Sequence, residues 1–332
     1  MSVTIKEIAK RCQVSVGTVD RALNNRRGIS EVTKNKILEV AKSLNYEPNH
    51  LAQSLATGST KTIGVVCINI TNPFFSSMVS YIEKIAAKNG YFLNLVLSHN
   101  QPEQELEGIL YLARRKVDGI IIFPIGKGPD YEKVLKSLSV PIVTIYNRIS
   151  DEFYHVNIDA KKIMKEAVEM MIGKGYERIV YMNLGIYQSR EKNINLDSME
   201  QRKEGYEEGM KEAGLPLEIY EKCSKDMEMD KIFDKEKLKK KTAFLCNCDE
   251  IAIKVLNLVR KYGLSCPEDV GIMGFDNIEI LNSITPKIYS VDCHLKDVGK
   301  QAMDLLFGEM KHKERDIRSV NVDYEITKGE SL

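Results

Sequence analysis

From residue 62 onward, short apolar runs alternate with longer amphipathic stretches. The apolar runs have strand length and few polar positions, as in residues 63–68 and 119–123. Nearly continuous apolar strands separated by helical patterns favour parallel sheets that helices cover on both faces. The expected strands are 63–68, 92–97, 119–123, 141–146, 179–183, 243–246 and 270–275, and the expected helices are 74–88, 103–115, 200–213 and 251–262. Two such series predict an α/β fold of two doubly wound parallel-sheet lobes, with ligands bound beyond the strand ends.

The first 47 residues have a different pattern, which predicts a small all-α head. Thr4, Ser15 and Ser30 are each N-cap candidates, and Thr4 with Glu7 matches the capping box. Apolar residues recur at helical spacing after each cap. Three helices of about 8, 8 and 14 residues with tight links are typical of a helix-turn-helix module.

The second predicted helix separates an apolar face from a polar one. At about 100° per residue, Val19 and Leu23 share one face, while Gly17, Arg21 and Asn24 lie on the other. Gly inside a helix costs about 1 kcal/mol relative to Ala, which is tolerable where the backbone approaches another molecule. Arg reads guanine and Asn reads adenine. The polar face therefore either reads DNA bases or simply meets water.

Charge is distributed unevenly along the chain. Net charge is +1, but residues 1–60 carry nine Lys/Arg against five acids, or +4, and the remainder carries −3. A basic head on a mildly acidic body favours contact of the head with a polyanion. Apolar runs reach only strand length, so we expect no membrane span, and the first residues lack a secretory pattern, so we expect a cytoplasmic protein. Seven scattered cysteines favour reduced thiols, and Cys246 and Cys248 lack zinc-site spacing.

The head resembles the DNA-binding head of the LacI/GalR (lac-repressor) family of bacterial transcription regulators. The resemblance lies in residues 4–9 (TIKEIA), 14–24 (VSVGTVDRALN), 44–49 (LNYEPN) and 51–55 (LAQSL). It implies base readers at Val16, Gly17 and Arg21, and hydroxyls on phosphates at Thr18, Ser30 and Thr33. The full set of implied DNA contacts is Thr4, Val16, Gly17, Thr18, Arg21, Asn24, Ser30, Thr33, Asn49, Ala52 and Leu55. The family usually has Ser where this chain has Asp20, which either accepts from cytosine or steers Arg21.

A short segment after Pro48 connects head and body. Pro48 ends the third helix, and the eight residues 49–56 are too few for a helix alone in water. The resemblance implies that this hinge becomes helical when two copies pair on DNA, with Leu55 as a wedge in a minor-groove step. Without the resemblance, Leu55 is an ordinary apolar linker residue.

The body resembles the effector domain of the same family, which has the type I periplasmic-binding-protein-like fold. The matching motifs are residues 72–75 (NPFF), 117–121 (VDGII), Arg202 with 205–206 (GY), 249–252 (DEIA), 267–270 (PEDV) and 274–276 (GFD). The implied effector contacts are Phe74, Phe75, Asn147, Arg148, Arg202, Cys248 and Asp276. Arg and a carboxylate can fork hydrogen bonds to adjacent hydroxyls, which suits a sugar. The family commonly has Asp at 147 and Asn at 248. Singly, Phe75 also fits a core position, Arg202 a pair with Glu200, and Asp276 a helix cap.

These features predict three domains in order. They are a DNA-binding domain at 1–47, a hinge and linker at 48–61, and an effector domain at 62–332. Lobe 1 is expected at about 62–158 and 292–321, and lobe 2 at about 159–291 and 322–332.

We expect a ligand-responsive transcriptional regulator that binds a pseudo-palindromic operator as a homodimer. By default it represses genes of carbohydrate uptake or catabolism, and its effector is a sugar or sugar derivative. No cofactor, metal site or membrane partner is expected. The alternative is a solute-binding protein of a sugar transporter, which the missing secretory pattern and the helical head disfavour. An enzyme is disfavoured because the sequence has no Gly-rich phosphate loop after the first strand, no G-x-S-x-G elbow and no His/carboxylate metal spacing.

Overall fold

The computed structural model describes residues 3–46, 54, 58–183, 193–221, 232–233, 236–311 and 318–332. The chain divides into two compact units, Met1–Thr60 and Lys61–Leu332. Of the helices in these described ranges, none combines the length and apolar character needed to cross a membrane.

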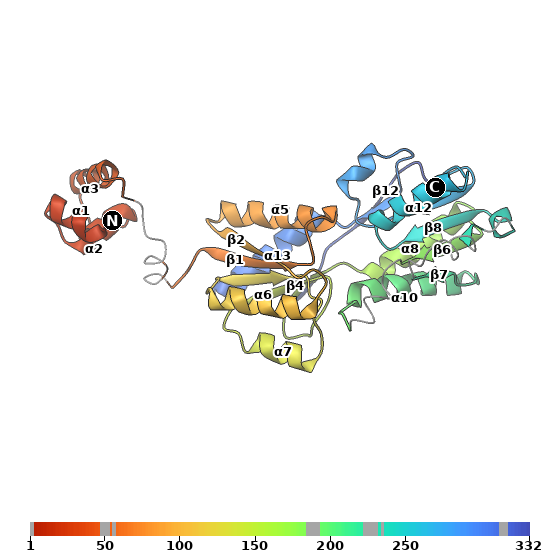
Figure 1. The fold of residues 1–332 in the computed structure, drawn as a ribbon, viewed down its shortest axis with the longest axis horizontal. Helices are drawn as coiled ribbons and strands as arrows, with labels where there is room; N and C mark the ends of the chain where they lie inside the picture. Colours follow the sequence, from red (N-terminus) through yellow and green to blue (C-terminus); the bar gives the residue numbers. More distant parts are fainter. Residues whose placement is uncertain are drawn as a thin grey trace. The chain divides into compact units, whose positions relative to one another are not determined.

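The first unit is the predicted bundle of three short helices, α1 (Ile5–Cys12), α2 (Val16–Leu23) and α3 (Glu31–Ser43) (Figure 1). Each helix begins after the predicted cap, because the side-chain oxygens of Thr4, Ser15 and Ser30 accept the backbone N–H three residues on. The small core has one or more fully buried residues from each helix. It contains Ile8, Ala9, Cys12, Val19, Ala22, Ile37 and Ala41. The helix-turn-helix prediction is confirmed.

Lobe 1 of the second unit is a six-stranded parallel sheet in the order β11-β5-β4-β3-β1-β2. Its strands are β1 Thr62–Cys67, β2 Phe92–Leu97, β3 Gly119–Ile122, β4 Ile142–Ile145, β5 Tyr154–Asn157 and β11 Ser319–Asn321. Its helices are α5 Pro73–Lys88, α6 Pro102–Arg114, α7 Pro129–Lys136 and α13 Leu295–Met310. Strand residues alternate between two cores, with Val65 and Ile121 in one, and Val66 and Ile120 in the other.

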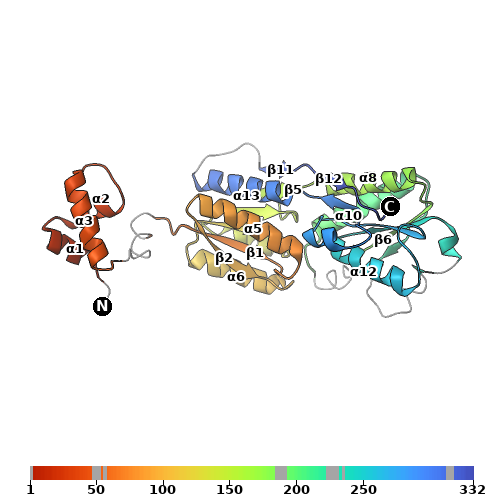
Figure 2. The same cartoon turned by 90° about the horizontal axis from the view of Figure 1, so that it is seen from above.

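The two faces of this sheet are covered by different helix pairs. Residues of α5 and α13 share the core of Val65, and these helices lie side by side (Figure 2). Residues of α6 and α7 share the core of Val66, and both helices lie on the opposite side of the sheet from α5 (Figure 1).

Lobe 2 is a four-stranded parallel sheet in the order β7-β6-β8-β9. Its elements are β6 Arg178–Met182, β7 Ile219–Tyr220, β8 Thr242–Cys246, β9 Val270–Met273, α8 Ala160–Gly173, α10 Asp197–Glu212, α12 Asp249–Lys261, and the one-turn helices η1 Lys237–Lys239 and η2 Glu279–Ser283. A short antiparallel pair, β10 (Ser290–Asp292) with β12 (Glu325–Thr327), lies where the chain passes between the lobes. The predicted pair of parallel α/β lobes is confirmed.

Candidate functional sites: a DNA-reading face and an effector cluster

The polar face of α2 is open, as its phase predicts. Val19 and Ala22 are buried, whereas Val16, Gly17 and Arg21 are exposed. A Cβ added at Gly17 would meet nothing closer than Ser15 Oγ, at 3.8 Å. The fold therefore has room for alanine at position 17. Glycine has a poor helix propensity, and packing within the protein gives no reason for glycine here.

The hydroxyls predicted to contact phosphates, Thr18, Ser30 and Thr33, lie at the helix caps. Ser15 Oγ accepts the Thr18 N–H at 3.1 Å, and the Ser15 and Thr18 hydroxyls lie 2.8 Å apart. Ser30 and Thr33 repeat this arrangement, again with 2.8 Å between hydroxyls. Capping by Ser15, Ser30 and Thr4 is established by these contacts. Contact of Thr18, Ser30 and Thr33 with phosphate stays a prediction.

Asp20 has intramolecular contacts that neither alternative for it included, and both alternatives stay predictions. Its carboxylate accepts from Asn24 Nδ2 at 2.8 Å and from Arg26 at 3.1 Å. The Asn24 amide also donates to the Asp20 carbonyl oxygen at 3.0 Å. Reading of adenine by Asn24 would therefore compete with its bonds to Asp20. The other three predicted contacts, Asn49, Ala52 and Leu55, lie outside the described residues.

In lobe 1, aromatic side chains gather at the start of α5 and the ends of two strands. The Asn72 side chain caps α5 by accepting from Phe74 N at 2.8 Å. Phe74 then packs on Phe75 and on Tyr146, with ring centroids 5.1 and 5.5 Å apart. Phe75 packs edge-on against Phe123 at 5.4 Å. Phe75 is half-buried and Phe74 and Tyr146 are buried, so this cluster forms an apolar wall.

In lobe 2, Arg202 and Asp276 form a buried ion pair. Arg202 Nη2 lies 3.6 Å from Asp276 Oδ1, and both side chains are only 8% exposed. Arg202 also donates to the Asn247 carbonyl oxygen at 2.5 Å, and its guanidinium lies 3.7 Å from the centroid of the Phe275 ring. Burial raises the pKa of Asp276 to about 7, although the Arg202 charge opposes this shift. Asp276 is thus a paired carboxyl in an apolar setting.

Several buried polar atoms of this region lack a hydrogen-bond partner within the described part of the chain. They are Tyr146 Oη, both side-chain polar atoms of Asn183, Arg202 Nε and Asp276 Oδ1. Burial raises the pKa of the Tyr146 hydroxyl, the nearby Cys293 and Asp276 add to this effect, and Arg202 opposes it. This hydroxyl from lobe 1 therefore lies close to the ion pair of lobe 2. Leaving such atoms unpaired costs about 1–3 kcal/mol each. A polar ligand that pairs with them would remove this cost.

Together, these residues define what we call the effector cluster: Phe74, Phe75, Tyr146, Arg202, Cys248 and Asp276. Cys248 is the N-cap residue of α12, and burial together with the Asp276 charge raises the pKa of its thiol to about 12. Neutral thiols bind metals poorly, and within the ranges that the structure describes no group of three metal-ligating side chains is found.

Sequence reasoning missed two residues whose polar atoms have no hydrogen-bond partner in the described ranges. Tyr146 directly follows β4, and Asn183 directly follows β6. The signal that could have found them is their place at the carboxyl ends of parallel strands, where ligands bind in such sheets. Tyr146 also has a φ of 63°, a left-handed conformation that is uncommon outside glycine.

The side chains of Asn147 and Arg148 contact other partners than the residues of the effector cluster. The Arg148 guanidinium pairs with Asp151 and is half exposed. The Asn147 amide bonds to backbone groups of both lobes. An effector contact by either residue stays a prediction.

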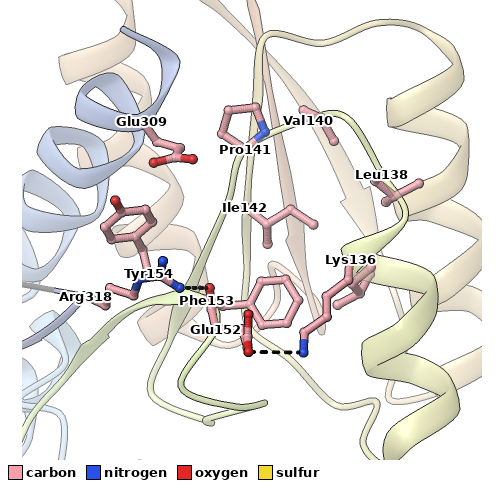
Figure 3. A pocket seen from close by; sticks show the side chains of 11 residues that line it. Lys136, Leu138, Val140, Pro141, Ile142, Glu152, Phe153, Tyr154, Glu309 and Arg318 are labelled. Carbon is pink, nitrogen blue, oxygen red and sulfur yellow. Dashed lines mark hydrogen bonds and ion pairs between the residues drawn. The ribbon is translucent and has the colours of Figure 1, made fainter. Parts of the chain in front are cut away.

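A hollow of about 630 Å³ lies in lobe 1 beside the start of β4 and β5 (Figure 3). It is lined both by apolar side chains, such as Leu138, Ile142 and Phe153, and by charged ones. Lys136 pairs there with Glu132 and Glu152, and Arg318 donates to the Glu152 carbonyl oxygen. Lys136 and Arg318 therefore already have partners within lobe 1.

Comparisons with known proteins agree with this architecture. Residues 4–49 match the model of the bacterial regulatory proteins of the lacI family, and residues 156–332 match that of a periplasmic binding protein-like domain. Catabolite control protein A of Priestia megaterium is 30% identical, with 98% of each chain covered. The HTH-type transcriptional regulator RegA of Clostridium acetobutylicum is 31% identical, over 100% of this chain and 99% of its own.

Solved structures show the same fold. The lac repressor dimer bound to operator and the anti-inducer ONPF superposes with a TM-score of 0.86 at 18% identity, covering 100% of this chain and 99% of its own. A LacI family transcriptional regulator from Enterococcus faecium with bound ribose gives 0.69 at 24% identity, covering 81% and 98%. With full-length relatives at 30% identity and both domain models matched in order, the chain belongs to the lacI family of bacterial regulatory proteins.

Proposed function

We propose that this transcriptional regulator binds a pseudo-palindromic operator as a homodimer and responds to a neutral sugar or sugar derivative. The observation that carries the effector proposal is the set of buried polar atoms in the effector cluster that have no hydrogen-bond partner among the residues the structure describes. Donors and acceptors there lack hydrogen-bond partners within the described residues, and the Arg202–Asp276 ion pair neutralises both charges. Sugar hydroxyls donate and accept at once, and aromatic rings cover sugar carbon faces, so a polyol fits better than an anion.

The DNA proposal rests on the open face of α2. Val16, Gly17 and Arg21 are exposed on a helix whose opposite face is buried, which is the arrangement a recognition helix needs in the major groove. Two-fold symmetry of the dimer would require two half-sites. The domains we assign are 1–47 for DNA binding, 48–61 for the hinge and 62–332 for the effector.

We further propose that the regulator represses genes of carbohydrate uptake or catabolism, that it catalyses no reaction, and that it acts in the cytoplasm, where a bacterial regulator meets the chromosome. The sugar-bound state of a structural relative supports the choice of ligand class.

A thermal-shift screen of a neutral sugar library tests the effector proposal. A sugar at 100 times its dissociation constant adds about 2.7 kcal/mol of stability. In Tyr146→Phe, we expect the best sugar to bind up to about tenfold more weakly, because one hydrogen bond is lost. Stability without sugar should not fall, since the removed hydroxyl has no partner in the described structure.

Tyr111→Phe is the matched control, because Tyr111 lies on α6 and is 46% exposed. It should keep the full sugar response. A library in which no sugar raises the melting temperature, or an unchanged response in Tyr146→Phe, would argue against a sugar in this cluster.

A further inference from the structure

The two lobes touch through a compact set of hydrogen bonds next to the effector cluster. Lobe 1 contributes the segments that follow β3 and β4, residues 124–126 and 147–148. Lobe 2 contributes residues 195–198, which lead into α10. Arg202 stands on the second turn of the same helix, so this contact and the effector cluster are joined by about one turn of α10.

Asn147 uses both ends of its amide group in this contact. Its Nδ2 donates to the Pro124 carbonyl oxygen at 2.8 Å within lobe 1, and to the Asn195 carbonyl oxygen of lobe 2 at 3.1 Å. Its Oδ1 accepts the Ser198 N–H at 3.0 Å. Only an amide supplies two donors and an acceptor in this geometry. A carboxylate, which the resemblance leads us to expect here, would face two carbonyl oxygens.

Asn195 makes the reciprocal bonds from lobe 2. Its backbone N–H donates to the Ile125 carbonyl oxygen at 2.7 Å, and its Nδ2 donates to the Arg148 carbonyl oxygen at 2.9 Å. The Arg148 N–H donates in turn to Asp197 Oδ2 at 3.3 Å. Two asparagine side chains thus bridge the lobes in opposite directions.

A buried carboxylate fixes the lobe-1 side of the contact. Glu105 of α6 is fully buried, and it accepts from the N–H groups of Ile125 and Gly126 and from the Tyr131 hydroxyl at 2.5–3.1 Å. These bonds hold the backbone of 124–126, which carries the acceptors for Asn147 and Asn195. Burying a carboxyl is unfavourable unless hydrogen bonds compensate. The hydrogen bonds that Glu105 accepts from the loop of residues 124–126 explain why a carboxyl is buried at this position.

We propose that Asn147 and Asn195 form an amide latch that holds the two lobes together before any effector binds, with Glu105 as a positioning residue for the latch. In this arrangement Asn147 acts between the lobes, and the effector enters a site whose halves are already aligned. The inference rests on the proposed effector response for its biological use. The latch itself is a property of the free protein and is tested without effector or DNA.

Hydrogen–deuterium exchange of the full-length, ligand-free protein tests the latch. The reporting peptides cover residues 193–198, whose N–H groups at 195 and 198 donate across the lobes. In Asn147→Asp, we expect protection of these peptides to fall about tenfold, as the loss of one or two hydrogen bonds would give. Protection of α8 around the buried Met164 should stay unchanged, which separates opening of the latch from unfolding.

The pH dependence of the variants identifies the amide donors as the cause. As pH falls, the introduced carboxyl of Asn147→Asp gains a proton and can donate again, so protection should recover. Asn147→Ala has no such group and should stay unprotected at every pH. The wild type, measured at each pH, is the reference that accounts for the other ionisable groups near the contact, Glu105, Asp197 and His155.

Two further variants complete the test. Glu105→Gln places an NH2 group against backbone donors and should also reduce protection at 193–198, while leaving α8 protected. Asp151→Asn is the matched control, because Asp151 lies in the segment after β4 and, within the described part of the chain, pairs with the Arg148 side chain alone. The latch proposal would be overturned if Asn147→Asp kept wild-type protection of residues 193–198. It would also be overturned if Asp151→Asn lost as much protection there as Asn147→Asp.

Discussion

At the scale of single residues, Asp249 shows how burial sets a charge state. Its carboxylate accepts from the Ile278 N–H at 2.9 Å and from the Ser290 hydroxyl at 2.6 Å, and its side chain is fully buried. Burial raises its pKa to about 8, with the nearby Asp276 adding to the effect and the hydrogen bonds opposing it. The folded protein therefore binds a proton at the Asp249 carboxyl more tightly than the unfolded chain does.

This carboxyl makes stability depend on pH. Because the folded-state pKa lies above the unfolded value of about 3.8, the contribution of Asp249 is largest at low pH and is lost as pH rises towards about 8. Asp249→Asn should flatten this part of the profile, since an amide keeps one acceptor for Ile278 N–H and donates to Ser290. The free energy of unfolding of both proteins, measured in urea at intervals from pH 5 to 8, tests this expectation. An equal fall with pH in both proteins would contradict the assignment.

Sequence reasoning identified some site residues and missed others for definite physical reasons. Arg202 and Asp276 were predicted from motifs, and the structure brings them together as an ion pair. The partners of Asp20, by contrast, depend on how the chain turns after α2 to bring Arg26 back. The bonds of Asn147 depend on residues 195 and 198, which are distant in sequence. Such contacts leave no periodic signal.

At the scale of elements, the packing of α8 against α10 depends on two glycines. A Cβ at Gly205 would lie 2.0 Å from the Lys161 carbonyl oxygen, and one at Gly209 would lie 2.9 Å from Val168 Cβ. The backbone carbonyl cannot move without shifting α8. Glycine at 205 therefore lets the two helices approach closely, at the expense of helix propensity.

Gly205→Ala should destabilise the protein by about 1–3 kcal/mol, the range for overpacking a core. Gly173→Ala, at the end of α8, is the control because an added Cβ there meets nothing within 4 Å. It should change stability by less than about 1 kcal/mol. Equilibrium unfolding in urea compares the two variants, and equal effects would show that the close approach of α8 and α10 is not what selects glycine.

Elements with strong patterns were predicted to within one or two residues, and weak ones were not. The three helices of the head, β1, α5 and β2 lie where the pattern placed them. Strand β11 has only three residues, none of them buried, and β5 carries the polar His155 and Asn157. Such strands form because neighbouring strands supply hydrogen bonds, so the sequence alone does not indicate them. Helices α7, α8 and α13 were left unassigned although their apolar spacing is helical.

At the scale of the whole molecule, function requires that two separately folded units act together. The three-helix unit has its own core, and the α/β unit carries the proposed effector site and the proposed latch between its lobes. A ligand can alter DNA affinity only by as much as its affinity differs between the two functional states. The account therefore requires both sequence-specific DNA binding and a ligand that changes it.

Fluorescence anisotropy with labelled duplexes tests this requirement most directly. The full-length protein is titrated with DNA from upstream of its own gene and with a scrambled duplex, each with and without the best sugar of the thermal-shift screen. We expect tighter binding of one upstream site, a change of that affinity on adding sugar, and in Arg21→Ala a loss of about 1–3 kcal/mol of discrimination at one base pair. Equal affinity for upstream and scrambled DNA, with no effect of any sugar, would contradict the account.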